Sequence, residues 1–505
     1  MEKFPDKNFE DANPNPEFLI KSIAEQGYSL ETALADLMDN SITANATRIE
    51  VLTKIDREPF ILFLSDDGDG MTAQSLKKNM QFPSRSPEEY RSTADLGRFG
   101  LGLKTASFSQ TRLFTVLSRK KGTTEYSGLT WDVKHLKDSG QWQMLINSEK
   151  EIKELLEQYG SVARSHLNNS NYYLPNTIVM WKGLYKFENY LSISNKQEAL
   201  KQEITNTTSE YLSIVFHRFM ENKIKPLQIR INNIIVKPFN PFPLDNSELR
   251  VLETLNRDFG NDFVKMQGFV LPNSSIKETK ENVNPWTPQN KSLMDMEGLY
   301  IYRADRLILF GGWNGLIKKM PRLQLGRLKI EIGNRVDHLF HLNVAKSQII
   351  IPHDLKSAFL RAIVDLKSES QKEYFNHGLR TFPQRPIEKS TELFYKTATN
   401  KGILLTVNNE FPLLKSLKNT LNKDQTGELN FIMKIASNLI NRVRQVDNIE
   451  LTGDIEKDGI SNDEILKSVK KLLDLGLSKE QIKKNILPNL GIKNNITDEI
   501  KNLLN

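Results

Sequence analysis

The sequence predicts an α/β protein of the layered α+β sandwich type, built from two mixed domains and a helical C-terminal region. Residues 1–188 alternate helical and strand patterns with many glycines between them. Residues 189–375 carry a second mixed pattern, and residues 376–505 are polar and mostly helical. A chain of 505 residues has room for three domains of the usual size, about 100–200 residues each.

The composition excludes several classes of chemistry. The chain has no cysteine, so it has no disulfide framework, no thiolate metal site and no cysteine nucleophile. Lys and Arg total 69 against 62 Asp and Glu, and the net charge of +7 permits contact with nucleic acid without requiring it. Residues 1–15 lack the basic and apolar regions of a signal peptide, and no apolar run approaches the roughly 20 residues of a membrane span. We therefore expect a cytoplasmic protein without membrane contact.

A helix is predicted over Leu30–Thr43, where apolar side chains recur at helical spacing. Asp36 and Asn40 are four residues apart and therefore lie on one face of this helix. One interpretation is a solvated helix face. The other is a nucleotide site, in which the Asn40 amide oxygen binds Mg²⁺ and Asp36 takes a proton from a water that attacks a phosphate.

A buried strand is predicted over Pro59–Leu64, and it leads directly into the acidic, glycine-rich stretch Ser65–Met71. Gly68 and Gly70 allow a tight turn and let a planar ligand lie close to the backbone. A carboxylate at the end of the strand can accept a hydrogen bond from an exocyclic amine such as adenine N6. An ordinary turn explains the same residues, because Asp and Gly dominate turns. A calcium loop does not, because the glutamate of the EF-hand spacing is missing.

A glycine-rich loop opens a short helix further along the chain. Its glycines and lysine are Gly97, Gly100, Gly102 and Lys104. Exposed backbone amides and a helix N-terminus favour an anion, and the lysine adds a positive charge. The spacing is not a Walker A loop, which would need lysine in place of Leu103, and not GxGxxG, because Thr105 stands at the last glycine position. A glycine hinge with an incidental lysine remains the alternative.

The order and spacing of these three motifs resemble the GHKL superfamily (gyrase B, Hsp90, histidine kinases and MutL), whose members share the Bergerat ATP-binding fold. ADLMDNS resembles the first box of the family, SDDGDGM the second, and GRFGLGLKTAS the third, which looks most similar to MORC-like ATPases. The strand NTIVMW resembles the fourth box, in which Thr177 matches a threonine that helps hold adenine. The resemblance covers roughly residues 17–185.

The resemblance implies a role for each matching residue. Asp36 would be the general base, Asn40 the Mg²⁺ ligand and Asp66 the adenine anchor, helped by Thr177. Further contacts to ATP would come from the second and third boxes, at Gly68, Gly70, Met71, Gly97, Gly100, Leu101, Gly102, Leu103, Lys104 and Thr105.

Two positions depart from the family pattern, and one stretch is expected to move. ATPase members usually have Glu where Asp36 stands, so the shorter carboxylate implies a closer water or slow turnover. Thr43 replaces an acid that is common in the first box. The polar stretch Thr72–Leu96 would be the mobile part of a lid over the nucleotide.

The second region also resembles GHKL proteins, in the transducer domain that follows the ATPase domain in MutL, gyrase and MORC proteins. The similarity lies in two stretches, Leu227–Val236 and Gly298–Leu309. Those proteins place a transducer lysine on the γ-phosphate, and Lys346 is the candidate here, with a solvated loop lysine as the alternative. Arg303 and Arg306 are expected to be structural or surface residues.

These expectations describe a Mg²⁺-dependent ATPase in which ATP closes the lid, two copies form a homodimer, and hydrolysis resets them. By resemblance the setting is a DNA-related process such as repair or bacterial anti-phage defence, with DNA and an effector nuclease as candidate partners. A weakly hydrolysing ATP-binding scaffold and an Hsp90-like chaperone remain as alternatives. A histidine kinase is disfavoured, because no pair of dimerisation helices with a phosphorylatable histidine is seen ahead of the ATP motifs. Zinc is not expected, because His338 and His341 lack further ligands in an obvious pattern.

Overall fold

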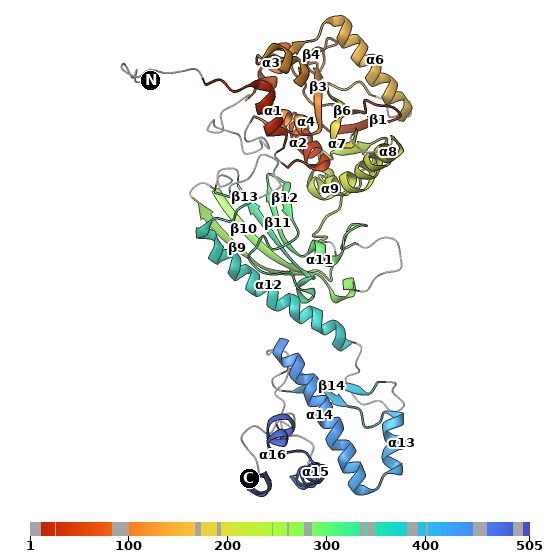
Figure 1. Ribbon diagram of the computed structural model, residues 1–505, viewed down its shortest axis with the longest axis vertical. Helices are drawn as coiled ribbons and strands as arrows, with labels where there is room; N and C mark the ends of the chain where they lie inside the picture. The colour runs from red at the N-terminus through yellow and green to blue at the C-terminus, as the bar shows by residue number, and fades with distance from the viewer. Residues whose placement is uncertain are drawn as a thin grey trace, which may run out of the picture. The chain divides into compact units, whose positions relative to one another are not determined.

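A computed structural model divides the chain into two compact units. The first unit comprises Met1–Leu271, Thr279–Lys319 and Gly326–Leu366, and the second comprises Pro272–Glu278, Met320–Leu325 and Lys367–Asn505. Both units combine helices with sheets, so the predicted α/β class is confirmed (Figure 1). The structure describes residues 12–25, 27–82, 100–166, 173–188, 193–244, 246–259, 262–276, 285–333, 339–340, 349–380, 392–399, 402–447, 462–487 and 498–504. Within these ranges no helix is long and apolar enough to cross a membrane.

The first sheet has eight strands, and all neighbouring pairs are antiparallel except β1 and β7, which are parallel. Its order is β5 (Leu145–Ile146), β4 (Ser127–Asp132), β3 (Thr111–Ser118), β6 (Thr177–Leu184), β2 (Ile61–Asp66), β1 (Arg48–Lys54), β7 (Gln228–Ile231) and β8 (Ile234–Ile235). The strand predicted at Pro59–Leu64 is β2, shifted by two residues and buried at every position. The strand predicted for the fourth motif is β6.

Helices cover both faces of this sheet. Side chains alternate along a strand, so Leu62 and Leu64 of β2 pack in the core with α2 and α4, whereas Ile61 and Phe63 pack with α6. The helices are α1 (Pro16–Ala24), α2 (Leu30–Thr43), α3 (Ala73–Met80), α4 (Gly102–Gln110), α5 (Val133–Ser139), α6 (Glu149–His166), α7 (Tyr185–Glu188), α8 (Ile193–Gln202), the π-helical turn η1 (Glu203–Thr208), α9 (Ser209–Val215) and α10 (His217–Met220). The alternation decides which face each residue at a strand end occupies.

The strand predicted at 227–236 is a short hairpin, β7–β8, and it extends the first sheet. The hairpin turns at Asn232 and Asn233, whose φ angles of 48° and 70° suit a two-residue turn. Asn232 Oδ1 accepts a hydrogen bond from Thr53 N at 2.9 Å, beside the parallel pairing of β7 with β1. A strand pattern does not specify which sheet the strand joins. This stretch, which the sequence likens to the start of a transducer domain, thus pairs with the first sheet and not with the second.

The second sheet belongs to the same unit and has five strands, in the order β12 (Arg306–Phe310), β11 (Gly298–Arg303), β13 (Gly326–Ile332), β10 (Asp262–Val270) and β9 (Arg250–Phe259). Short helices η2 (Asn273–Ile276), α11 (Leu293–Met296) and η3 (Pro321–Leu323) interrupt the chain between strands, and the long helix α12 (His353–Arg380) follows. The stretch singled out at 298–309 is the β11–β12 hairpin. Arg303 and Arg306 flank its turn, and both are fully buried, so neither is a surface residue.

The C-terminal region contains helices and one small sheet. Its elements are β14 (Phe394–Thr399), β15 (Gly402–Val407), α13 (Pro412–Thr420), α14 (Lys423–Asp447), α15 (Asn462–Asp474), α16 (Lys479–Gln481), the π-helical turn η4 (Ile482–Ile486) and α17 (Asp498–Leu504). Gly476 lies between α15 and α16 and has a φ of 93°. The β14–β15 hairpin was not predicted, because the helical character of the surrounding sequence masks a two-stranded sheet.

Candidate functional site

Helix α2 spans Leu30–Thr43, as predicted. It begins with a capping box, in which Ser29 and Thr32 satisfy the first backbone amides. Its apolar side chains pack in the core with the sheet. Asp36 is buried as well, with 2% of its surface exposed, whereas Asn40 is exposed. A solvated helix face is therefore the wrong description for Asp36.

A tyrosine holds the Asp36 carboxylate in place. The Tyr28 hydroxyl donates to Asp36 Oδ2 at 2.7 Å, and it lies 3.4 Å from Thr105 Oγ1 of α4. Burial and the neighbouring Asp36 charge raise the pKa of Tyr28, so its hydroxyl stays protonated and remains a donor. Gly102 faces the same carboxylate, since a Cβ at this residue would lie 3.4 Å from Asp36 Oδ2. Asp36 is thus placed against the first turn of α4, the turn predicted to bind phosphate.

Asn40 is arranged so that its amide oxygen can serve a ligand. Its Nδ2 donates to the Asp36 carbonyl oxygen at 3.1 Å, which uses the nitrogen of the amide. Among the described residues there is no group of three or more His, Asp or Glu side chains that could hold a metal ion. A cation at Asn40 would therefore rely on oxygen atoms of a ligand and on water, which suits Mg²⁺ bound together with phosphates.

Three strand ends bring three polar side chains into one row. Asp66 ends β2, Thr177 begins β6 and Ser118 ends β3, and the strand register pairs Asp66 with Thr177 and Thr177 with Ser118. The alternation of side chains places all three on the face that α2 and α4 cover. Ser118 Oγ and Thr177 Oγ1 are 2.9 Å apart, and Ser118 Oγ also accepts from Met71 N at 3.0 Å.

Two neutral donors hold the Asp66 carboxylate, which is 3% exposed. The Ser41 hydroxyl donates to Oδ2 at 2.8 Å, and Gly68 N donates to Oδ1 at 2.9 Å. Burial raises the pKa of Asp66 to about 6, although these two hydrogen bonds oppose the shift. Each carboxylate oxygen has capacity for another hydrogen bond, so ionised Asp66 can accept one from an amine of a ligand. Ser41 also ties this strand end to the helix that carries Asp36.

The turn after β2 owes its shape to Gly70 and to an aspartate that faces away from the row. Gly70 has a φ of 62°, and a Cβ there would overlap the carbonyl oxygen of Arg119. Asp67 accepts hydrogen bonds from the backbone amides of Thr47 and Arg48, at 2.7 and 2.8 Å. This aspartate therefore fixes the turn, and it leaves Asp66 as the carboxylate that the motif presents in the row.

Lys104, the lysine of the third motif, is buried in the first turn of α4 and is 1% exposed. Its Nζ donates to the carbonyl oxygens of Asn79 and Gly100, at 2.8 and 2.7 Å, and burial lowers its pKa to about 7. A phosphate would have to share Lys104 with these two carbonyl groups. Leu101 precedes the helix, and Leu103 packs against the core.

The stretch 72–96, predicted as a mobile lid, begins with a helix. Helix α3 covers Ala73–Met80, and Leu76 and Met80 are fully buried in the core. The prediction is wrong for this part, because Leu76 and Met80 are one helical turn apart and form an apolar face. Gly97 and Lys346 lie outside the described residues, and their roles stay predictions.

The sequence analysis did not identify Tyr28, Ser41 and Ser118. Ser41 follows Asn40 directly and lies inside the first motif, so its position was a usable signal. Ser118 carries no local signal, because its place in the row depends on which strands pair. Tyr28 lies in the irregular segment before α2, where no periodicity indicates its direction.

The N-terminal part of the chain is similar to known proteins. Residues 28–162 match the family model described as histidine kinase-, DNA gyrase B-, and HSP90-like ATPase. The ATPases MORC2 of Homo sapiens and MORC2A of Mus musculus are each 33% identical to this chain over 94 residues, which are 18% of this chain and 9% of theirs. MORC2B of Mus musculus is 34% identical over 95 residues, again 18% and 9%. The chain thus matches only about a tenth of the length of these relatives.

A solved structure, described as the crystal structure of the N-terminal domain of a DNA repair protein, is 15% identical to this chain. The superposition covers 72% of this chain and 99% of that one, with a TM-score of 0.39.

The motifs resemble those of GHKL ATPases and of their MORC-like members, and the family model and the MORC2 proteins confirm this resemblance. The Bergerat-type fold of the first domain is confirmed with it.

Proposed function

We propose that this chain, whose residues 28–162 match the model of the histidine kinase-, DNA gyrase B- and HSP90-like ATPases, binds ATP with Mg²⁺ and hydrolyses it. One observation carries the proposal. The sheet register puts Asp66 and Thr177 on the same face as helix α2, and Ser41 of that helix bonds Asp66 directly. The groups expected to hold adenine are therefore tied to the helix that carries Asp36 and Asn40.

Each residue of the candidate site has a separate role in this proposal. Ionised Asp66 accepts a hydrogen bond from the adenine amine, beside the hydroxyls of Thr177 and Ser118. Asn40 offers its amide oxygen to Mg²⁺, which would hold the phosphates at the first turn of α4. Asp36, oriented by Tyr28, accepts the proton of the attacking water. Mg²⁺ held at Asn40 would stabilise the negative charge on the phosphates.

Phosphate release by the wild-type chain and by Asp36→Asn, with Mg²⁺ and with a chelator, tests this proposal. We expect Asp36→Asn to lower kcat by roughly 10²–10⁴-fold while ATP binding is retained, because positioned proton acceptors contribute rate enhancements of this size. Asp69→Asn is the matched control. Asp69 belongs to the same acidic motif as Asp66 but bonds Asn45, at 2.9 Å, so its variant should keep normal turnover. Equal rates for wild type and Asp36→Asn would remove Asp36 from the reaction.

A weakly hydrolysing scaffold is the second candidate, because Asp36 is one methylene shorter than the glutamate usual in these ATPases. This candidate predicts that the wild-type chain binds ATP but releases no phosphate above the rate measured without protein. The two functions therefore differ in the absolute rate of phosphate release by the wild-type chain.

The wider setting of the reaction is also a proposal. From the motif resemblance to GHKL proteins, we propose a nucleotide-gated homodimer acting in a DNA-related process, such as repair or anti-phage defence with a partner nuclease. Mass photometry with a non-hydrolysable ATP analogue, with and without DNA, tests it. We expect a dimer with the analogue and a monomer without it; a monomer under both conditions would exclude the gated dimer.

A further inference from the structure

A buried ion pair joins the second sheet to the candidate ATP-binding helix. Arg306, the first residue of β12, extends to Asp39 of α2, and its Nε lies 2.8 Å from Asp39 Oδ1. Both side chains are almost fully buried, with 1% and 2% of their surfaces exposed. Asp39 directly precedes Asn40 and follows Asp36 by three residues, so it lies within the turn that carries the candidate catalytic groups.

The β11–β12 hairpin is built to present this arginine. Its two turn residues, Ala304 and Asp305, have φ angles of 46° and 62°, and Arg306 follows them directly. The guanidinium lies 5.7 Å from the ring centre of Phe216, just before α10, and Nη1 donates to the Leu307 carbonyl oxygen at 3.3 Å. Burial alone would lower the pKa of Arg306, but the charge of Asp39 and other nearby groups raise it, so the guanidinium stays charged.

A second set of contacts docks the same hairpin onto α10 without touching α2. His217 Nε2 lies 2.9 Å from the Tyr302 hydroxyl. Arg218 pairs with Asp305 at 3.0 Å and with Glu331 of β13 at 2.8 Å. The docking of the second sheet and its contact with the ATP-binding helix are therefore made by different residues, which can be changed one at a time.

We propose that Arg306 is a positioning residue for the ATPase site: through Asp39 it fixes the last turn of α2 and so sets the place of Asn40 and of the Mg²⁺ it would bind. An α-helix is rigid over one turn, so a side chain clamped at Asp39 restricts the rotation of its neighbours Asp36 and Asn40. A shift of the β11–β12 hairpin must either carry this turn with it or break a buried ion pair, which is costly. The effect of Arg306 on Asn40 and Mg²⁺ rests on the proposed ATPase function. Its restriction of helix α2 does not depend on that function.

The test compares Arg306→Met with Arg218→Met in the full-length chain. We expect Arg306→Met to speed amide hydrogen exchange in residues 30–43 and to raise the Mg²⁺ concentration for half-maximal turnover by at least about tenfold, since misplacing a positioned group by 1 Å can cost about 10²-fold. Arg218→Met weakens docking alone, so it should leave both quantities near the wild-type values. The double variant Asp39→Leu with Arg306→Met removes both charges, which often restores the stability lost with a broken buried pair.

The outcomes separate the two proposals. Wild-type chain without ATP turnover overturns the proposed function, and exchange in residues 30–43 still decides whether Arg306 holds α2. Unchanged exchange in Arg306→Met overturns the inference. If the double variant regains stability and also a normal Mg²⁺ requirement, the pair is merely structural and the positioning role is excluded. If it regains stability but keeps the raised Mg²⁺ requirement, the positioning role stands.

Discussion

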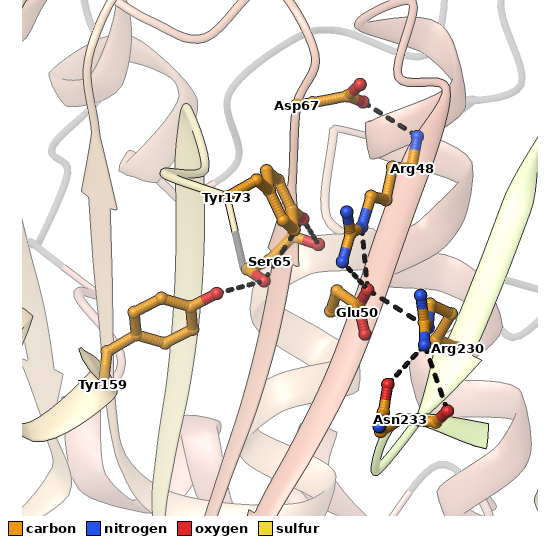
Figure 2. Close-up of polar contacts among 8 residues, drawn as sticks. All are labelled: Arg48, Glu50, Ser65, Asp67, Tyr159, Tyr173, Arg230 and Asn233. Atoms are coloured by element: carbon orange, nitrogen blue, oxygen red, sulfur yellow. Dashed lines mark hydrogen bonds and ion pairs between the residues drawn. The ribbon is translucent and has the colours of Figure 1, made fainter. Parts of the chain in front are cut away.

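On the face of the first sheet that α6 covers, Glu50 is buried between two arginines (Figure 2). Its Oε1 lies 2.7 Å from Arg48 Nη2 and 3.6 Å from Arg230 Nε. Nearby, Ser65 Oγ lies 3.1 Å from the Tyr159 hydroxyl, on the same face. On this face the buried carboxylate has cationic partners that come from strands of its own sheet.

One residue further along β2 the opposite face holds a buried carboxylate differently. Asp66 accepts hydrogen bonds from the Ser41 hydroxyl and the Gly68 amide, both neutral donors. A carboxylate between guanidinium groups is compensated inside the protein, whereas one held by neutral donors keeps a charge that a ligand can use. Burial of a charged residue therefore does not mark a functional site; the kind of partner distinguishes the two faces.

The largest effect, on the stability of the protein, should follow from removing the Glu50 carboxylate. Glu50→Ala leaves the buried Arg230 and the half-buried Arg48 without their counter-charge, and removing one partner of a buried pair costs about 3–5 kcal/mol. We expect the free energy of unfolding, measured by urea denaturation, to fall by about this amount. ATP affinity, measured where the variant is still folded, should not change.

Glu50→Gln keeps the size of the side chain and serves as the control, with a smaller loss of stability. A marked loss of ATP affinity in folded Glu50→Gln would contradict the division of the two faces into a structural and a ligand-binding one.

A smaller effect, on affinity, is expected at Asp66. Asp66→Asn replaces a charged acceptor by an amide, and hydrogen bonds to charged groups contribute about 1.5–3 kcal/mol, so ATP should bind roughly 10–100-fold more weakly. Because burial raises the pKa of Asp66 to about 6, wild-type affinity should fall as the pH drops from 7 to 5, when the acceptor becomes protonated. Isothermal titration calorimetry across this range measures both effects.

Asp66→Asn is also the control for the pH series, since ATP phosphates titrate equally with both proteins. The same pKa lies above the ordinary aspartate value of 3.8, so the folded state binds this proton more tightly than the unfolded state does. The contribution of Asp66 to stability therefore falls as the pH rises from 3.8 to about 6, while ATP affinity rises. Identical pH dependence of affinity in wild type and variant would exclude Asp66 as the adenine acceptor.

The sequence indicates the parts of the candidate site that follow from local patterns and misses those that depend on strand pairing. Asp36, Asn40 and Asp66 could be placed because helical spacing and a strand followed by a turn are local patterns. The Arg306–Asp39 pair could not be predicted, because 267 positions separate its members along the chain. For the same reason the sequence does not indicate that the β7–β8 hairpin joins the first sheet.

The smallest effect tests whether the neutral donors on the α2 face serve catalysis. Tyr28→Phe removes the hydroxyl that donates to Asp36 and leaves the ring in place. A hydrogen bond to a carboxylate contributes at least about 1.5 kcal/mol, so kcat should fall about tenfold while ATP affinity stays unchanged. Tyr159→Phe is the matched variant on the α6 face, where the hydroxyl meets Ser65, and it should leave kcat unaltered. If both variants lower kcat alike, the loss comes from the packing of the sheet, and Tyr28 does not orient the base.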